Sequence, residues 1–230
     1  MIFHGLQKMT LLDYPGKVAC TLFTGGCNLR CPFCHNAILV TGLSDAEVIP
    51  EEEILSFLKK RTGILDGVAV TGGEPLLMPD IIEVLGKIKS LGYSIKLDTN
   101  GTFPDRLKEI TELGLVDYIA VDIKNSKEKY PETVGVADFD ITPVEKTVEF
   151  LKQGRIEYEF RTTVTREFHS IETIKDAAKW IEGADKYFLQ AFVDSENLIG
   201  SDIHGVEKSE MEEMKKVAEK FVGRVEIRGL

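Results

Sequence analysis

Three cysteines in a short segment carry the clearest chemical signal of this chain. Cys27, Cys31 and Cys34 form the pattern Cys-x3-Cys-x2-Cys directly after a predicted strand, and residues 24–26 (Thr-Gly-Gly) free the backbone to turn. This spacing can aim three sulfur atoms at one point. The fourth cysteine, Cys20, lies inside the predicted strand, and we expect it to be a small core residue. A disulfide framework would spread its cysteines over longer loops.

Three thiols at this spacing allow three kinds of site. A zinc site would need His35 as its fourth ligand, but the side chains of the adjacent Cys34 and His35 diverge. A thiol redox pair would use Cys31 and Cys34 and leave Cys27 unexplained. An iron–sulfur cluster held by three protein ligands would leave one iron open to a substrate or cofactor.

Composition narrows the class of protein. The chain has 230 residues, 43% of them hydrophobic and 29% charged, and a net charge of −10 from 28 Lys and Arg against 38 Asp and Glu. These values are typical of a globular protein and argue against a disordered or membrane-spanning chain. The acidic balance predicts no nucleic-acid partner and no membrane partner. The N-terminal residues show no signal-peptide pattern, so we expect a cytoplasmic protein with reduced thiols.

Short β-rich runs alternate with helical stretches along the chain, which is typical of an α/β fold with a parallel sheet. We expect one domain over residues 1–230, with either a doubly wound sheet or an incomplete (β/α) barrel. The predicted strands are Lys17–Thr24, Gly67–Thr71, Ser94–Asp98, Tyr118–Lys124, Glu157–Thr165, Lys186–Phe192 and Arg224–Arg228. The predicted helices are Pro50–Arg61, Pro79–Leu91, Pro104–Leu113, Thr142–Gln153, Ser170–Ile181 and Ser209–Phe221, the last with a capping box of Ser209 and Glu212.

Polar motifs follow several of these strands. Residues 71–75 (Thr-Gly-Gly-Glu-Pro) follow the second strand, residues 97–101 (Leu-Asp-Thr-Asn-Gly) end the third, and residues 121–124 (Val-Asp-Ile-Lys) end the fourth. Arg161, inside the fifth strand, is expected either to reach the site or to form a structural ion pair. Because parallel strands of α/β folds carry their sites at the carboxyl ends, these motifs predict one common site.

Together, these motifs resemble the radical S-adenosylmethionine (SAM) superfamily. The Cys-x3-Cys-x2-Cys loop with Phe33 before its last cysteine matches the superfamily pattern, as does the Gly-Gly-Glu-Pro motif. Residues 34–36 (Cys-His-Asn) and 13–16 (Asp-Tyr-Pro-Gly) are similar to the glycyl-radical-enzyme activases. The stretch from about Gly5 to Asn36 most resembles the activases that serve anaerobic ribonucleoside-triphosphate reductase. The resemblance implies a partial (β/α)6 TIM-like barrel of radical SAM type.

The resemblance also implies a role for each motif. Cys27, Cys31 and Cys34 would hold a [4Fe–4S] cluster whose open iron is chelated by SAM. The expected SAM-binding residues are Phe33 at the adenine, Gly72, Gly73 and Glu74 at the methionine portion, and Asp98, Asp122, Lys124 and Arg161. In pyruvate formate-lyase activase, the aspartates that match Asp98 and Asp122 help to hold a monovalent cation, which Thr99 would join here.

One departure concerns histidine. Pyruvate formate-lyase activase has a histidine near the cofactor after its sixth strand, and this chain has none there. That cofactor contact is expected either to be absent or to be supplied by Gln190 or Asp194. The other histidines, His4, His169 and His204, show no supporting pattern and are expected at the surface.

The implied reaction is reductive cleavage of SAM to a 5′-deoxyadenosyl radical that takes a hydrogen from a glycine and leaves a glycyl radical. The implied partners are anaerobic ribonucleotide reductase as protein substrate and a flavodoxin- or ferredoxin-type electron donor. The alternatives are a pyruvate formate-lyase-type activase or a radical SAM enzyme that acts on another peptide or a small molecule.

Overall fold

Alternating strands and helices give the chain an α/β fold with a mostly parallel sheet, seen in a computed structural model that describes residues 1–194 and 197–230. Residue contacts divide the chain into two compact units. The first comprises Met1–Asn28 and Ile38–Ile119, and the second comprises Leu29–Ala37 and Ala120–Leu230. That the chain acts as one domain over residues 1–230 stays a prediction.

The first unit contains a sheet whose strands run in the order β6, β5, β3, β2. Its strands are β2 (Gly5–Thr10), β3 (Ala19–Thr24), β5 (Gly67–Gly72) and β6 (Ser94–Thr99). Strands β3, β5 and β6 are parallel, while β2 is an antiparallel edge strand. The short strands β1 (Ile2–Phe3) and β4 (Ile49–Pro50) pair separately. Thr24 is paired with Gly72, so β3 and β5 end side by side.

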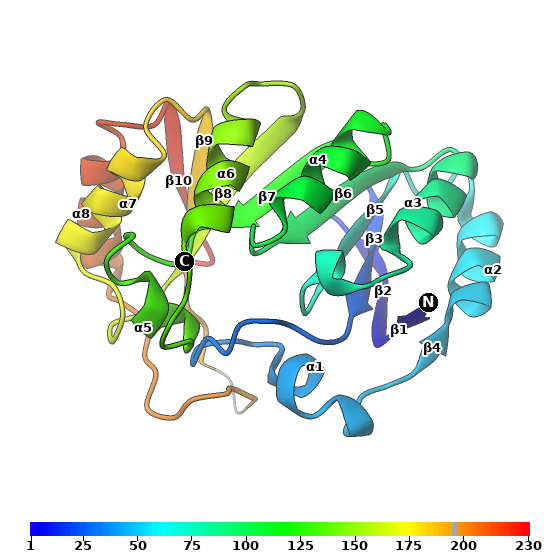
Figure 1. Ribbon diagram of the computed structural model, residues 1–230, viewed down its shortest axis with the longest axis horizontal. Coiled ribbons are helices and arrows are strands. Elements are labelled where there is room, and N and C mark those ends of the chain that lie inside the picture. Colours follow the sequence, from blue (N-terminus) through cyan, green and yellow to red (C-terminus); the bar gives the residue numbers. More distant parts are fainter. Residues whose placement is uncertain (195–196) are drawn as a thin grey trace. The chain divides into compact units, whose positions relative to one another are not determined.

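Amphipathic helices cover this sheet. They are α2 (Glu51–Arg61), α3 (Ile81–Ser90) and α4 (Pro104–Glu112), with α1 (Ala37–Thr41) and the 3₁₀ turns η1 (Leu43–Asp45) and η2 (Pro75–Leu77) in the connections. Helix α3 buries Ile81, Val84, Leu85 and Ile88, a spacing that forms one apolar stripe. Helices α2 and α3 contact each other, and α3 contacts β6 (Figure 1).

The second unit has its own run of strands in the order β10, β9, β8, β7. These are β7 (Tyr118–Asp122), which begins in the first unit, β8 (Glu157–Val164), β9 (Lys186–Ala191) and β10 (Arg224–Arg228). Its helices are α5 (Tyr130–Val134), α6 (Thr142–Leu151), α7 (Ile171–Trp180) and α8 (Lys208–Ala218). Helices α7 and α8 lie side by side, and α8 contacts β9 and β10 (Figure 1).

The predicted strands and helices are confirmed in type, with shifts of a few residues at their ends. The predicted capping box at Ser209 is wrong because α8 already begins at Lys208. A capping box occurs instead on α7, where Ser170 accepts from the Thr173 backbone and the Thr173 hydroxyl accepts from Ser170. Among the described residues, no helix has both the length and the apolar character needed to cross a membrane.

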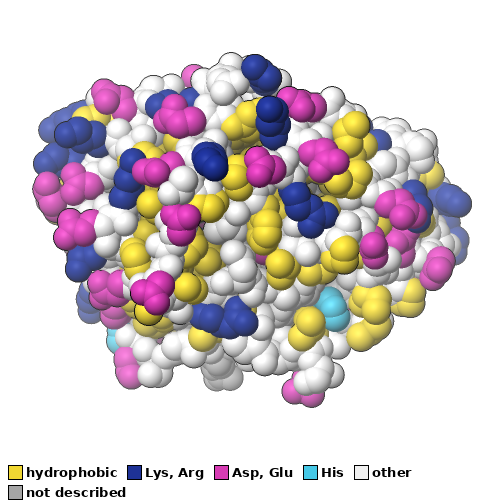
Figure 2. Space-filling view, viewed as in Figure 1, with side chains coloured by type: hydrophobic (Ala, Val, Ile, Leu, Met, Phe, Trp, Pro, Cys, Tyr) yellow, Lys and Arg dark blue, Asp and Glu magenta, His cyan; other side chains and the backbone are white. Residues whose placement is uncertain are grey.

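Charges of both signs are interspersed with hydrophobic side chains on the face drawn in Figure 2. Several ion pairs join exposed side chains along one helix, such as Lys108 with Glu112, and pairs of that kind contribute little to stability. The pair between Glu159 on β8 and Arg228 on β10 is different. Glu159 is fully buried, and both its carboxylate oxygens accept from the Arg228 guanidinium at 2.9 and 3.0 Å.

Arg228→Ala is expected to lower the free energy of unfolding by about 3 kcal/mol, because it removes the bidentate partner of a buried carboxylate. It also removes the guanidinium that lies 3.3 Å from the centroid of the Phe188 ring. Arg224→Ala is the matched control, since Arg224 is on the same strand but exposed, and its loss should cost less than about 1 kcal/mol. Urea unfolding followed by circular dichroism gives both free energies. Equal losses in the two variants would contradict the stabilising role of the buried Glu159–Arg228 pair.

Candidate functional site

Two loops of the first unit are locked together where β3 and β5 end. The Gly73 backbone N–H donates to the Thr24 carbonyl at 2.8 Å, and the Glu74 N–H donates to the Gly26 carbonyl at 2.8 Å. A Cβ added to Gly73 would lie 1.9 Å from the Gly26 oxygen. Gly72 has a φ of +113°, which favours glycine, and a Cβ there would lie 2.5 Å from Thr24 backbone atoms. The glycine pair is therefore needed for the packing of these two loops.

Glu74 ties the same loop to the end of β6. Its side chain is fully buried. One carboxylate oxygen accepts from the Leu76 backbone N–H at 3.0 Å and the Thr99 hydroxyl at 2.8 Å, and the other accepts from the Asn100 N–H at 2.7 Å. Hydrogen bonds to an ionised carboxylate are stronger than neutral ones, so Glu74 fixes the loop geometry. Its expected contact with the SAM ammonium group stays a prediction.

Asn100 connects this network to the first of the three cysteines. Its Nδ2 lies 3.8 Å from the Cys27 Sγ and donates to the Asn28 side chain at 2.9 Å. Its Oδ1 accepts from the Thr102 backbone and hydroxyl at 3.0 and 2.6 Å. An amide donor beside a sulfur favours the thiolate form. Sequence reasoning did not single out Asn100, although its place in the motif that ends β6 was a usable signal.

A buried lysine lies on β6 next to the expected site residue Asp98. Lys96 is 2% exposed, and its ammonium forms an ion pair with the Asp98 carboxylate. Residues two apart on a strand point to the same face, so the pair shares one side of β6. Lys96 was missed because it interrupts a β-rich run in which the pattern predicts an apolar residue.

In the second unit, Asp122, Lys124 and Arg161 form one charged cluster. The Asp122 carboxylate accepts from Arg161 Nε and Nη2 at 3.0 Å each, and from Lys124 Nζ at 3.0 Å. Burial alone would raise the pKa of Asp122, but the two cations lower it to about 2. Burial alone would lower the pKa of Lys124, but Asp122 and the nearby Cys31 thiol hold it above its usual range. The structure therefore brings these three predicted residues together.

Cys31 and Cys34 belong to the same unit. Cys31 is buried, Cys34 is half-buried, and the Cys34 N–H donates to the Cys31 carbonyl at 3.0 Å in a tight turn. Burial raises the pKa of Cys34, while a backbone hydrogen bond from Asn36 and the charge of Lys124 oppose that rise. Phe33 lies between the two cysteines in sequence and packs its ring on Phe168, with centroids 5.7 Å apart. Its expected contact with adenine stays a prediction.

The prediction that His169 lies at the surface is wrong. His169 is buried, its Nε2 hydrogen-bonds the Lys124 carbonyl oxygen at 2.8 Å, and its Nδ1 accepts from the Thr165 N–H at 3.1 Å. Burial lowers its pKa to about 4, so the ring is neutral at physiological pH. This histidine therefore fixes the backbone that carries Lys124. Its position in a loop after β8 gave no periodic signal of burial.

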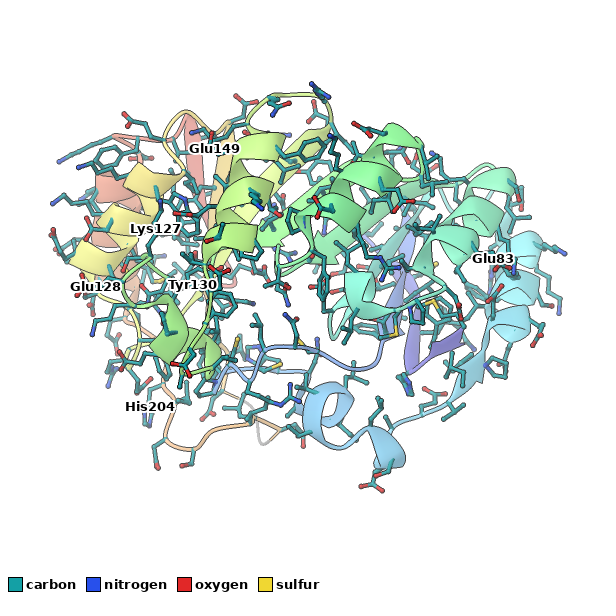
Figure 3. All side chains as sticks on the ribbon, viewed as in Figure 1. Glu83, Lys127, Glu128, Tyr130, Glu149 and His204 are labelled. Carbon is teal, nitrogen blue, oxygen red and sulfur yellow. The ribbon has the colours of Figure 1, made fainter. Side chains whose placement is uncertain are left out.

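Tyr130 and His204, both labelled in Figure 3, differ in burial. Tyr130, from α5, is buried and donates its hydroxyl to the Asp122 carbonyl at 3.3 Å. His204 is exposed, as predicted, and pairs with Glu167. The two residues weighed as replacements for the absent histidine also differ, since Gln190 is half-buried on β9 and Asp194 is exposed.

The cysteines present a donor set suited to a soft metal centre. Cys27 is in the first unit, and Cys31 and Cys34 are in the second. Among the residues that the structure describes, neither unit by itself arranges three His, Cys, Asp or Glu side chains as a formed metal site. Cys20 is confirmed as a core residue, because it is fully buried in β3 and burial raises its pKa to about 12. Thiols next to amide and ammonium donors fit a group held by thiolates.

The sequence matches a protein-family model and several known proteins. The family model described as the radical SAM superfamily matches residues 21–181. A Methanocaldococcus jannaschii protein, named as a glycyl-radical enzyme activating enzyme, is 30% identical over 99% of this chain and 95% of its own length. The pyruvate formate-lyase-activating enzyme of Clostridium pasteurianum is 33% identical over 53% of this chain and 52% of that enzyme.

Solved structures share the fold. Streptococcus suis SuiB, in a crystal structure with bound SAM, superposes on 91% of this chain with a TM-score of 0.70. The sequence identity is 13%, so this likeness concerns the fold alone, and the matched region is 52% of the SuiB chain. The matched regions thus cover about half the length of SuiB and about half the length of the C. pasteurianum enzyme.

Proposed function

This chain belongs to the radical SAM superfamily, and we propose that it activates a glycyl-radical enzyme by removing a hydrogen atom from one glycine of that partner. The family implies a [4Fe–4S] cluster and SAM as cofactors. The observation that carries the proposal is the match, over nearly the full length of both chains, to the M. jannaschii protein with that name. The chemistry is that of a radical SAM oxidoreductase.

The residues present fit these cofactors. Cys27, Cys31 and Cys34 would hold the cluster through their thiolates, and Glu74 with the Gly72-Gly73 backbone would bind the methionine portion of SAM. When bound, the cluster and SAM supply one-electron cleavage of a carbon–sulfur bond and a hydrogen-abstracting group. The protein's own contribution is to hold the thiolates, orient the SAM and exclude water.

Two neighbours of the cysteines prepare them for this task. The Asn100 amide beside Cys27 and the Lys124 ammonium, which acts on Cys31 and Cys34, both favour the thiolate form. His169 keeps Lys124 in place through the Lys124 carbonyl and stays neutral, so it adds no charge of its own. Within each unit, these neighbours of the cysteines are thus in place before any cofactor binds.

For the partner, we propose anaerobic ribonucleotide reductase, with a flavodoxin- or ferredoxin-type protein as electron donor in the cytoplasm. The stretch from about Gly5 to Asn36 supports this choice through its resemblance to the activases of that reductase. The C. pasteurianum match supports pyruvate formate-lyase as the second candidate.

The test is electron paramagnetic resonance of the reduced, iron-loaded protein mixed with SAM and each candidate partner under anaerobic conditions. A glycyl-type doublet with ribonucleotide reductase is the expected result, and replacing the partner's radical glycine by alanine should remove it. A doublet with pyruvate formate-lyase alone would change the partner. If SAM is cleaved to 5′-deoxyadenosine and neither partner gives a doublet, the activase proposal fails.

A further inference from the structure

We propose that Lys96 takes the place of the monovalent cation expected beside Asp98, so that this protein binds SAM without Na⁺ or K⁺. The inference rests on the proposed function, because it concerns the residues expected around the SAM carboxylate. The resemblance to pyruvate formate-lyase activase implies a cation held by Asp98, Thr99 and Asp122. In the structure, each of these three residues already has protein partners.

The partner of Asp98, the first expected cation ligand, is the Lys96 ammonium. It shares one face of β6 with Asp98, forms an ion pair with it, and is 2% exposed, while the Asp98 side chain is 14% exposed. Lysine is rarely buried without a partner, since an isolated ammonium is costly to remove from water. A cation tethered two residues away also acts at an effective concentration that a dissolved ion matches only at millimolar levels or above. Asp98 therefore carries a built-in counterion.

Thr99, the second expected ligand, is engaged elsewhere. Its hydroxyl donates to the Glu74 carboxylate at 2.8 Å and accepts from the Gly101 backbone N–H at 3.1 Å. Thr99 is adjacent to Asp98 on a strand, so their side chains point to opposite faces. To bind a cation with its oxygen, Thr99 would have to give up part of the network that fixes Glu74.

Asp122, the third expected ligand, is compensated inside the second unit. Arg161 contacts one of its oxygens through two nitrogens, and Lys124 contacts the other, all at 3.0 Å. One carboxylate thus faces two protein cations. Adding a third positive charge there would cost repulsion rather than relieve it. Both expected aspartate ligands are therefore neutralised by side chains of the protein itself.

The first test uses the wild-type, iron-loaded protein. SAM affinity is measured by equilibrium dialysis in choline chloride, NaCl and KCl at equal ionic strength, and ²³Na NMR line widths report any bound ion. We expect the affinities to agree within about twofold and no SAM-dependent line broadening. A rise of about tenfold in NaCl or KCl, equivalent to about 1.4 kcal/mol, would overturn the inference.

The second test removes the tethered cation. Lys96→Met should weaken SAM binding in choline chloride by about tenfold or more, and NaCl or KCl should restore it. Lys108→Met, at an exposed position on α4, is the control and should bind SAM equally in all salts. A folded Lys96→Met protein that binds SAM normally in choline, or that no salt rescues, would contradict the role of Lys96.

The variants and salts also separate the two proposals. If Lys96→Met does not fold, the double variant Lys96→Met/Asp98→Asn removes both charges of the pair. Its SAM affinity, at whatever level, should then be the same in choline chloride, NaCl and KCl, and a salt requirement in that variant would count against the inference. Cation-dependent SAM binding by the wild type would overturn the Lys96 proposal and leave the proposed function standing. No SAM binding in any salt would overturn the proposed function and the inference with it.

Discussion

Replacement of Cys27, Cys31 or Cys34 by alanine is expected to reduce SAM cleavage to less than about 1% of the wild-type rate, because loss of even an outer partner of a metal ligand typically costs 10–100-fold. Each variant should also lose most of its iron and sulfide after anaerobic reconstitution. Both quantities are measured directly, by iron and sulfide analysis and by chromatography of 5′-deoxyadenosine. Iron is expected at about four atoms per wild-type chain, whereas a zinc site would hold one metal ion.

Cys20→Ala is the matched control for this series. Cys20 lies seven residues before Cys27 and is fully buried in β3. Its replacement should lower the free energy of unfolding by about 1 kcal/mol and leave the iron content and SAM cleavage unchanged. If Cys20→Ala lost its iron while one of the other three variants kept it, the division of the cysteines into three ligands and one core residue would be wrong.

Gly73→Ala is expected to destabilise the protein by about 3 kcal/mol or more, because the new methyl group would overlap backbone atoms that cannot rotate away. Its Cβ would lie 1.9 Å from the Gly26 oxygen and 2.7 Å from the Gly26 carbonyl carbon. Gly26 directly precedes Cys27, so the shift would also move the first cysteine. Thermal unfolding and iron content of the same preparation measure the two effects.

Gly86→Ala tests whether this effect is specific to the loop. Gly86 lies inside α3, and a Cβ there would meet only the Leu115 Cδ2, at 3.9 Å. Alanine favours a helix, so this variant should be about 0.5–1 kcal/mol more stable than the wild type, with normal iron content. A Gly73→Ala protein as stable and as rich in iron as Gly86→Ala would show that the two loops are not locked as described.

Much of the fold could be predicted because hydrophobic periodicity and turn residues act locally. The strand Arg224–Arg228 was predicted with its observed bounds. The main helices begin and end close to the capping, proline and glycine residues that predicted their ends. The edge strand β2 was missed because Gly5–Thr10 pairs on one side only and keeps exposed polar and apolar residues. Its pairing depends on β3, which no local pattern reveals.

In the candidate site, too, local motifs predict some residues, while others depend on tertiary contacts. The motifs at the strand ends identify Asp122, Lys124 and Arg161, and the structure joins them in one cluster. Lys96 and His169 were missed, because a buried charge or imidazole is tolerated only when tertiary partners satisfy it. Asp98 lies beside Lys96 because the strand places residues two apart on one face, and the Lys124 carbonyl reaches His169 from 45 residues earlier in the sequence.

The close fit between residues 24–27 and 72–75 also sets a rule for recombining this chain with its relatives. Each loop contributes backbone donors or acceptors to the other, and the space at Gly73 is shaped by the Gly26 carbonyl. A chimaera with a crossover between these segments would combine two loops that were never selected to fit each other. Crossovers placed outside both segments, for example near the exposed turn at Gly92, would keep the two loops from the same parent protein.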